Sequence, residues 1–134
     1  MQVWDAIVIG AGCAGLTLVN ELINRGGDRL RVLLLEERNE YTNDRTWGFW
    51  NTLNHRFENA VSYRWPSWSV HYAGEVTHCR GSYQYQYLRA EHFYKLALAP
   101  VSSSSKTTLK LGEHVQTVQE EEDLVRIQTH QGTH

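Results

Sequence analysis

The stretch that decides the fold is Asp5–Gly15, which reads DAIVIGAGCAG. It begins inside an apolar run, Val3–Ile9, whose only charge is Asp5, and such a run predicts a buried parallel strand. A Gly-x-Gly-x-x-Gly pattern follows, and the segment 12–24 has the apolar spacing of a helix. A strand, a glycine-rich turn and a helix in this order are typical of a dinucleotide-binding domain.

The glycines of the turn have separate physical purposes. Gly10 allows the tight turn, Gly12 lets the backbone approach a pyrophosphate, and Gly15 permits close packing of the helix on the strand. The free N–H groups and the positive dipole end of the helix attract phosphate. We interpret Cys13 as a small residue that fits beside the cofactor, because no second cysteine lies near it in the sequence. The expected contacts are Gly10, Ala11, Gly12, Cys13, Ala14 and Gly15.

A second apolar run, Arg31–Leu35, predicts another buried strand that ends at Glu36, after a helix end at Gly26-Gly27-Asp28. Glu36 follows Gly15 by 21 residues, where a carboxylate accepts hydrogen bonds from the hydroxyls of an adenosine ribose. This acid disfavours a 2′-phosphorylated nucleotide, because two anions would face each other. FAD and NAD share the adenosine end, so the loop alone does not separate them. The segment AIVIGAGCAGLTL is similar to the first segment of flavoproteins with two dinucleotide domains, which favours FAD.

Beyond Asn39 the pattern changes to antiparallel strands. Residues 68–78 alternate around Ala73-Gly74 and predict a hairpin, and residues 82–87 (SYQYQY) place tyrosines on one strand face and glutamines on the other. A short helix is predicted over Ala90–Ala99.

Pro100 is expected to end that helix, and Ser102–Ser105 to form a flexible link. Two further strands are predicted at Leu109–Val118 and Leu124–Thr129, joined by the acidic turn 120–123.

Composition narrows the class of protein. With 134 residues, a net charge of -2 and two cysteines, the chain predicts one globular domain in a reducing compartment, with no general attraction to nucleic acid. The seven histidines lack paired ligand spacing, and we expect no metal site. The predicted fold class is α/β: a Rossmann-like FAD-binding β-α-β unit at residues 1–38, inserted antiparallel strands and a short helix at 39–100, and a strand pair at 107–130.

Three segments together resemble the bacterial lycopene cyclase family: DAIVIGAGCAGLTL, LLLEE and NDRTWGFW. These flavoproteins close the ends of the linear carotenoid lycopene into β-ionone rings. The resemblance covers essentially the whole chain and is sharpest from Asp5 to Trp50. It implies FAD with NAD(P)H as reductant, lycopene as substrate, and a cytoplasmic protein in peripheral contact with a membrane, without a protein partner. It also implies that the strand around Val115 passes the adenine.

The segment Tyr41–Trp50 (YTNDRTWGFW) carries the residues that distinguish this family. We expect Arg45 to neutralise phosphate charge or to hold the loop through Asp44. Three large rings then line a slot for a long hydrocarbon: Trp47, Phe49 and Trp50. The alternative is an Asp-Arg pair that fastens a loop, with aromatic side chains that simply fill the core.

Family members are longer than this chain, and we interpret it as the N-terminal part of a larger flavoprotein. A third nucleotide-binding strand and the acids that protonate lycopene are expected beyond His134, so no catalytic residue is assigned within the chain. Two alternatives stay open: an FAD-dependent hydroxylase or isoprenoid reductase that shares the FAD domain, and a non-catalytic nucleotide-binding module.

Overall fold

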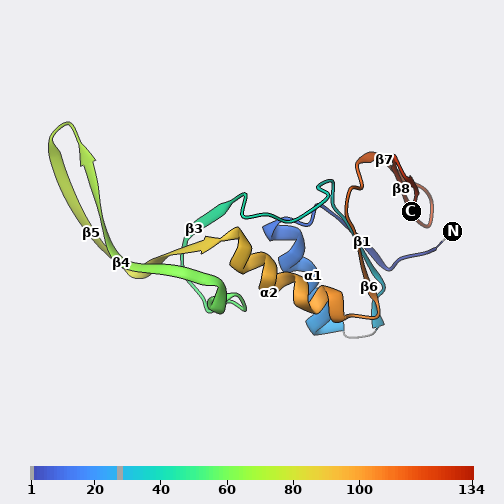
Figure 1. Ribbon diagram of the computed structural model, residues 1–134, viewed down its shortest axis with the longest axis horizontal. Helices are drawn as coiled ribbons and strands as arrows, with labels where there is room; N and C mark the ends of the chain where they lie inside the picture. The colour runs from blue at the N-terminus through green and yellow to red at the C-terminus, as the bar shows by residue number, and fades with distance from the viewer. Residues whose placement is uncertain (1, 27–28) are drawn as a thin grey trace. The chain divides into compact units, whose positions relative to one another are not determined.

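The computed structural model describes residues 2–26 and 29–134 (Figure 1). The chain divides into two compact units: the first contains Met1–Tyr41 and Ala97–His134, and the second contains Thr42–Leu96. The predicted strand pair at 107–130 therefore belongs to the same unit as the β-α-β motif. Of the predicted helix end, Gly27 and Asp28 lie outside the described residues.

The first unit is built on a parallel sheet, which confirms the α/β fold class. Strand β1 (Ala6–Ile9), helix α1 (Cys13–Gly26) and strand β2 (Val32–Leu35) form the predicted β-α-β motif, with Val8 opposite Leu34. All four residues of β2 are buried, because β2 is the central strand of the order β1-β2-β6.

Strand β6 (Thr107–Lys110) pairs in parallel with β2 and is the third strand of this sheet. The expectation that the third strand lies beyond His134 is therefore wrong. The predicted strand Leu109–Val118 joins β6 to the following strand, but Gly112 has φ +69 and interrupts the extended chain there. The two threonines of β6 favour a strand through their β-branched side chains, although the preceding serines resemble a linker.

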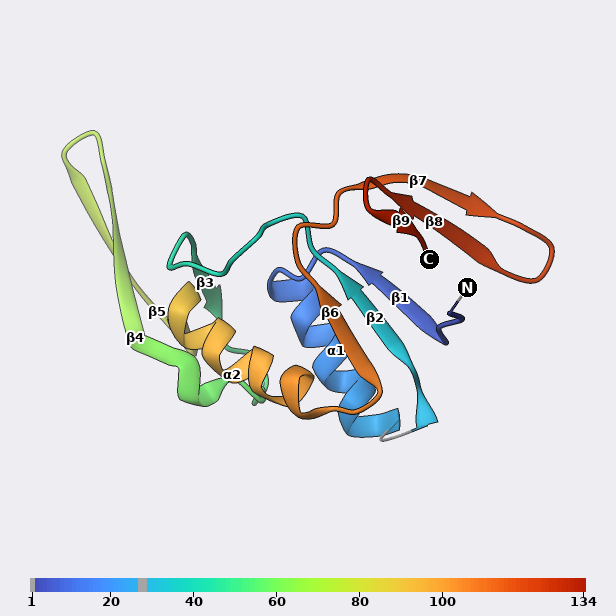
Figure 2. The ribbon, with the colours of Figure 1, turned by 45° about the vertical axis from the view of Figure 1, so that its right-hand side comes forward.

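An antiparallel sheet covers one face of the parallel sheet (Figure 2). Its strands are β7 (Val115–Glu120), β8 (Val125–Thr129) and β9 (Gly132–Thr133), with order β7-β8-β9. The core between the two layers contains the buried side chains of Leu33, Leu35 and Ile127, with Trp4, Ile7 and Val115 packed against them. Because side chains alternate along a strand, Val8 and Leu34 face the opposite side, where α1 lies.

Helix α2 (Ala90–Ser103) continues past Pro100, so the prediction that this proline ends the helix is wrong. Proline removes one helical N–H group and normally kinks or breaks a helix. Here the turn around it carries two buried side chains, Ala97 and Val101, and the amide of Asn20 in α1 donates to the carbonyl of Ala97 at 2.8 Å. This burial offsets the lost hydrogen bond. Neither of the described helices is long and apolar enough to cross a bilayer.

The second unit is a three-stranded antiparallel sheet of order β3-β5-β4. Its strands are β3 (Thr46–Trp50), β4 (Val61–Tyr72) and β5 (Glu75–Arg89), and a 3-10 helix, η2 (Glu58–Ala60), precedes β4. The predicted hairpin is present: Ala73 and Gly74 have φ 49 and 84, as a tight turn with two left-handed residues requires. Strand β3 was not predicted.

The β4-β5 ladder is interrupted near its middle. Trp65 pairs with Tyr85 and Ser67 pairs with Arg80, so the segment 81–84 of β5 lies opposite the single residue Pro66. Proline has no N–H group to donate to a neighbouring strand, which explains why pairing is broken at this position. The interruption divides the hairpin into an inner and an outer part.

Candidate dinucleotide site

The glycine loop between β1 and α1 has the geometry that its motif predicts. Gly10 has φ +90, and its N–H donates to the carbonyl of Leu35 at 2.8 Å, which ties the loop to the end of β2. A Cβ atom on Gly15 would overlap the carbonyl oxygen of Gly10, so helix and turn are in contact there. A Cβ atom on Gly12 would meet no protein atom within 4 Å. Packing within the protein thus requires Gly15, while Gly12 keeps the backbone accessible for a ligand.

Glu36 lies buried at the end of β2, directly beside this loop. Its Oε2 accepts a hydrogen bond from the Ala11 N–H at 2.7 Å, and its Oε1 accepts bonds from the backbone N–H and the Nε of Arg38, at 3.1 and 3.0 Å. Burial raises the pKa of the Glu36 carboxyl, but the hydrogen bonds from Arg38 and Ala11 outweigh burial and hold this pKa below its ordinary value. The site therefore presents an ionised carboxylate.

Arg38 and Tyr41, which are not among the predicted site residues, complete the arrangement around Glu36. The Arg38 guanidinium lies 5.2 Å from the centre of the Tyr41 ring, and the Tyr41 hydroxyl donates to the carbonyl of Ala11 at 3.0 Å. The segment after β2 is thus fastened to the glycine loop at two points. The spacing was the available signal, because a basic residue two positions after Glu36 can reach back to its carboxylate.

Cys13 begins α1 and is half-buried. Burial raises the pKa of its thiol, and a hydrogen bond with Thr17 lowers it by a smaller amount, so the net shift disfavours the thiolate. This favours our interpretation of Cys13 as a small residue of the loop rather than a nucleophile. Ala14, the other small residue of this turn, is exposed.

Val115 opens β7 and packs against the core that contains Leu33 and Leu35. The residues before β7 are joined to the end of β2, since the Glu113 N–H donates to the Glu36 carbonyl at 2.8 Å. His114 Nδ1 lies 2.8 Å from Glu37 Oε1. The structure therefore brings Val115, Glu36 and the glycine loop into one unit.

Arg45 and the three predicted slot residues belong to the other unit. Arg45 Nε lies 3.4 Å from Asp44 Oδ2 in an exposed ion pair. Trp47 and Phe49 point to one face of β3, where Trp47 contacts the rings of Phe93 and Tyr94, at centroid distances of 5.1 and 5.8 Å.

Trp50 points to the opposite face of β3 and contacts Trp68 and Tyr85. The structure thus does not bring Trp47, Phe49 and Trp50 together, because neighbouring side chains on a strand point to opposite sides. The Trp47 ring packs in the interior of its unit, as the core-filling alternative expects.

Residues 5–134 match the model of the family described as lycopene cyclase protein. The chain belongs to the lycopene cyclase family. This confirms the resemblance carried by the glycine loop, the LLLEE strand and the NDRTWGFW segment. A search of curated protein sequences gives no significant match.

Solved flavoproteins share the backbone fold of this lycopene cyclase family member. p-Nitrophenol 4-monooxygenase PnpA from Pseudomonas putida DLL-E4 matches with a TM-score of 0.76 and 14% identity, over 98% of this chain and 38% of that chain. PqsL, a probable FAD-dependent monooxygenase from Pseudomonas aeruginosa, matches with a TM-score of 0.72 and 17% identity, over 96% of this chain and 39% of that one. PieE, a flavin-dependent monooxygenase solved with FAD and substrate, has a TM-score of 0.70 and 16% identity, over 94% and 26%. The chain thus spans less than two fifths of each protein, and the likeness establishes its Rossmann-like fold.

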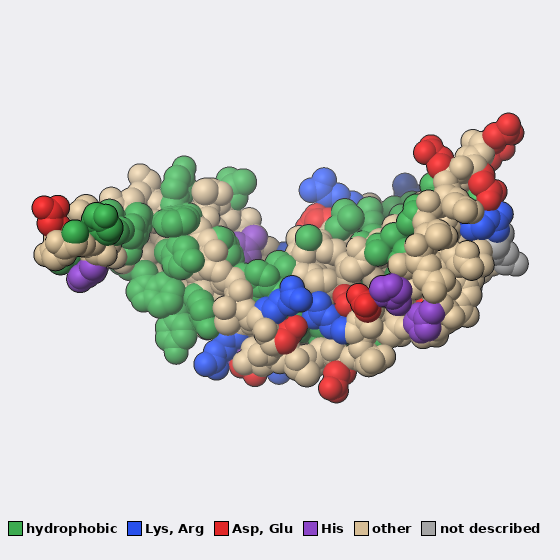
Figure 3. Space-filling view, turned by 90° about the horizontal axis from the view of Figure 1, so that it is seen from above, with side chains coloured by type: hydrophobic (Ala, Val, Ile, Leu, Met, Phe, Trp, Pro, Cys, Tyr) green, Lys and Arg blue, Asp and Glu red, His purple; other side chains and the backbone are tan. Residues whose placement is uncertain are grey.

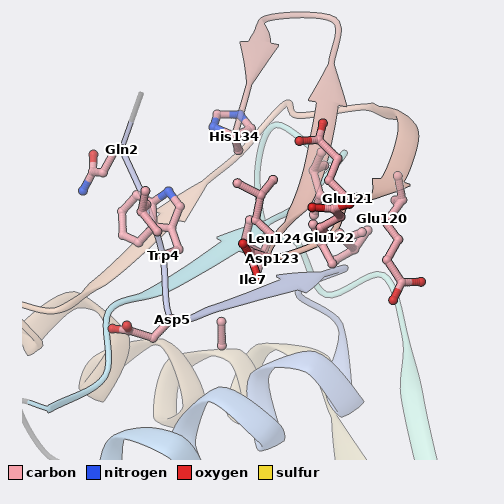
Figure 4. A pocket seen from close by; sticks show the side chains of 16 residues that line it. Gln2, Trp4, Asp5, Ile7, Glu120, Glu121, Glu122, Asp123, Leu124 and His134 are labelled. Carbon is pink, nitrogen blue, oxygen red and sulfur yellow. The ribbon is translucent and has the colours of Figure 1, made fainter.

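This chain has a cavity of about 660 Å³ on the face of β1 that points away from α1 (Figure 4). Its walls are apolar, with Trp4, Ile7 and Leu124 among them, and its rim carries the acids of the turn 120–123. Four carboxylates repel a pyrophosphate, and none of the loop glycines lines this space. The cavity is therefore not the dinucleotide site.

Proposed function

We propose that this chain is the FAD-binding part of a lycopene cyclase, which converts acyclic lycopene into carotenoids with β-ionone rings. The observation that carries the proposal is the ionised Glu36 beside the glycine loop, in a chain of the lycopene cyclase family. A carboxylate at this place binds the ribose of an adenosine, and the helix N-terminus next to it binds phosphate.

The residues present fit an adenine dinucleotide. The open space over Gly12 admits the pyrophosphate, the first N–H groups of α1 donate to it, and Glu36 accepts from the ribose. A carboxylate has about four lone-pair positions, of which Ala11 and Arg38 use three. If both ribose hydroxyls are to donate to Glu36, the Arg38 side chain must therefore release one of these positions. We propose the backbone of Val115 as the contact for the adenine, and Arg45 as a contact for the phosphates.

The proposed reaction is an isomerisation. A proton adds at one end of lycopene, the ring closes, and a proton leaves the ring, so substrate and product have the same mass. Bound FAD, reduced by NAD(P)H, supplies electron density that stabilises positive charge beside the substrate. The residues of this chain hold the cofactor, and we assign the acid that donates the proton to a part of the full-length protein outside this chain. We propose that the full-length protein is cytoplasmic and, because lycopene is apolar, contacts the surface of a membrane.

A second candidate is an FAD-dependent hydroxylase, which the likeness of the fold to several monooxygenases favours. The two candidates differ in what happens to the mass of the product. Full-length protein with FAD, NAD(P)H and lycopene in lipid vesicles is expected to form a cyclic product of unchanged mass, detected by chromatography with mass spectrometry. A product heavier by one oxygen atom would overturn the cyclase proposal and favour the hydroxylase.

A further inference from the structure

One face of the β3-β5-β4 sheet carries a continuous set of aromatic side chains, which we name the aromatic row. In the register of the sheet, Trp50, Tyr85 and Trp65 lie side by side across the three strands. Tyr87 and Tyr63 occupy the next position on the same face, two residues along each strand. Trp68 contacts Trp50 from beyond the ladder interruption. The row consists of Trp50, Tyr63, Trp65, Trp68, Tyr85 and Tyr87.

The rings of the row touch one another without a gap. Trp50 lies 4.9 Å from Tyr85 and 5.7 Å from Trp68, between ring centres. Trp65 lies 6.2 Å from Tyr85 and 5.7 Å from Tyr63, on which it stacks. These are ordinary separations for aromatic pairs, so the rings form one apolar strip along the sheet.

The backbone of β3 is adapted to this strip. A Cβ atom on Gly48 would overlap the hydroxyl of Tyr85, so the Tyr85 ring lies directly across β3 at this glycine. Any other residue at position 48 would displace the ring from the row.

The two faces of this sheet differ in burial and in charge. On the opposite face, Gln86 and Leu88 are buried, and the ring of Trp47 packs against Phe93. In the row, by contrast, Trp50, Tyr63 and Trp65 are 50%, 57% and 42% exposed. Figure 3 shows hydrophobic side chains gathered over the part of the molecule that β4 and β5 form.

One charged side chain, Arg89, shares the face of the row: it follows Tyr87 by two residues on β5, at the end of the row, and its Nη1 lies 3.5 Å from Glu91 Oε1. Arg64 separates Tyr63 from Trp65 in sequence and therefore points to the other face, where it forms an ion pair with Glu58 at 2.6 Å. The row itself contains only uncharged rings. An exposed strip of uncharged rings matches an uncharged ligand, because a charged ligand group that lies on the rings would lose its hydration without gaining a partner.

We infer that the aromatic row binds a long, uncharged, conjugated hydrocarbon of the isoprenoid class. The inference rests on the proposed function, whose substrate has this chemistry, and it assigns the substrate contact to the row instead of to Trp47 and Phe49. Along β4 the row extends from Tyr63 to Trp68, roughly 16 Å at about 3.3 Å per residue. A strip of this length and width accommodates a rod-shaped polyene that lies flat on the rings, and stacking is favourable along its conjugated chain.

The test uses the 134-residue chain and all-trans-retinol, an uncharged conjugated isoprenoid whose own fluorescence reports binding. Trp65→Lys removes one ring and places a charge in the row, and is expected to weaken retinol binding by about tenfold or more. Tyr63→Lys, at a more exposed position of the row, provides a second variant in case the first fails to fold. Tyr72→Lys is the matched control, since Tyr72 is 82% exposed and lies at the hairpin tip outside the row. This control is expected to bind retinol like the unchanged chain.

Equal retinol affinity in the row variants and the control would overturn the inference. So would a result in which the row variants lose only binding to vesicles of phosphatidylcholine and phosphatidylglycerol, because the row would then be a membrane contact. The proposed function has a separate readout in the full-length protein. Normal lycopene cyclisation with Trp65→Lys would overturn the inference and leave the cyclase intact. Loss of retinol binding in the row variants, with an unchanged protein that does not cyclise lycopene, would support a hydrocarbon site and reject the cyclase.

Discussion

The two units of this chain carry two candidate sites that are built in different ways. The dinucleotide site depends on the backbone: a turn with a left-handed glycine, a helix start, and a carboxylate held by N–H groups. The aromatic row depends on side chains that different strands bring together through register. In the first kind of site, we expect substitution of a single glycine to abolish stability or ligand binding. In the second kind, we expect loss of a single ring to weaken ligand binding only in part. The predictions below test this difference.

The largest expected effect is the loss of stability in Gly15→Ala, measured against Gly12→Ala. Alanine normally stabilises a helix relative to glycine, but at position 15 its Cβ would overlap the Gly10 carbonyl. We expect the free energy of unfolding to fall by about 3 kcal/mol or more. Gly12→Ala meets no protein atom and should leave stability within about 0.5 kcal/mol while weakening ADP binding. Urea unfolding and titration calorimetry measure both, and equal stability of the two variants would contradict the packing argument.

The next comparison separates the two faces of β3. Trp47→Ala removes a ring that packs against Phe93 and Tyr94, and should cost about 3 kcal/mol of stability. Trp50→Ala removes a half-exposed ring of the aromatic row, and should cost about 1 kcal/mol. Chemical denaturation of both variants measures the difference. A larger loss for Trp50→Ala would show that the row, and not the face toward α2, is the core of this unit.

The affinity for the adenosine part of the cofactor should depend on the negative charge of Glu36. Glu36→Lys replaces the buried carboxylate with a cation, and is expected to weaken ADP and FAD alike, by about 1.5–3 kcal/mol for each lost charge-assisted hydrogen bond. ADP and FAD should also compete for one site. Glu36→Gln is the control for charge at nearly constant shape. Unchanged ADP affinity of the lysine variant in calorimetry would remove Glu36 from the site.

The smallest effect concerns pH. The pKa of Glu36 lies below its ordinary value of 4.5 in the folded chain, because the hydrogen bonds from Arg38 and Ala11 outweigh burial. A carboxylate with a lowered folded pKa stabilises the fold above its unfolded pKa, and this contribution is lost as the pH falls from 4.5 through the folded value. In Glu36→Gln the free energy of unfolding should therefore depend less on pH in this window, and an identical slope in both proteins would contradict the assignment.

Sequence reasoning succeeded where the signal lies in consecutive residues. The β-α-β motif and the glycine turn are such signals, because the local backbone requires these residue types. Glu36 lies beside this turn, where its position after β2 predicts it. Sequence reasoning failed where tertiary contacts decide. Strands β3 and β6 have five and four residues, and pairing with β5 and β2 fixes them as strands. Burial of Ala97 and Val101 likewise carries α2 past Pro100, against the local preference of proline.

Only part of the candidate site could be predicted from the sequence. The sequence predicted Glu36 beside the glycine loop, where the structure places it, but it did not predict the contacts of Arg38 with Glu36 and of Tyr41 with Ala11. It grouped Trp47, Phe49 and Trp50 by proximity in the chain, although alternation on a strand separates them. The row partners of Trp50 come from β4 and β5, and the register that joins them is visible only in three dimensions.

The interruption of the β4-β5 ladder at Pro66 has a consequence for motion. Ladder hydrogen bonds are broken between the Trp65–Tyr85 and Ser67–Arg80 pairs, so the outer hairpin can open while the inner strands stay paired. Its amide hydrogens should therefore exchange with solvent faster than those of the inner ladder. Trp68 lies on the outer side of this hinge and Trp65 on the inner side. We therefore expect the Trp68 end of the aromatic row to be more mobile than the Trp65 end, and the hydrogen exchange rates of the two parts of the hairpin would measure this difference.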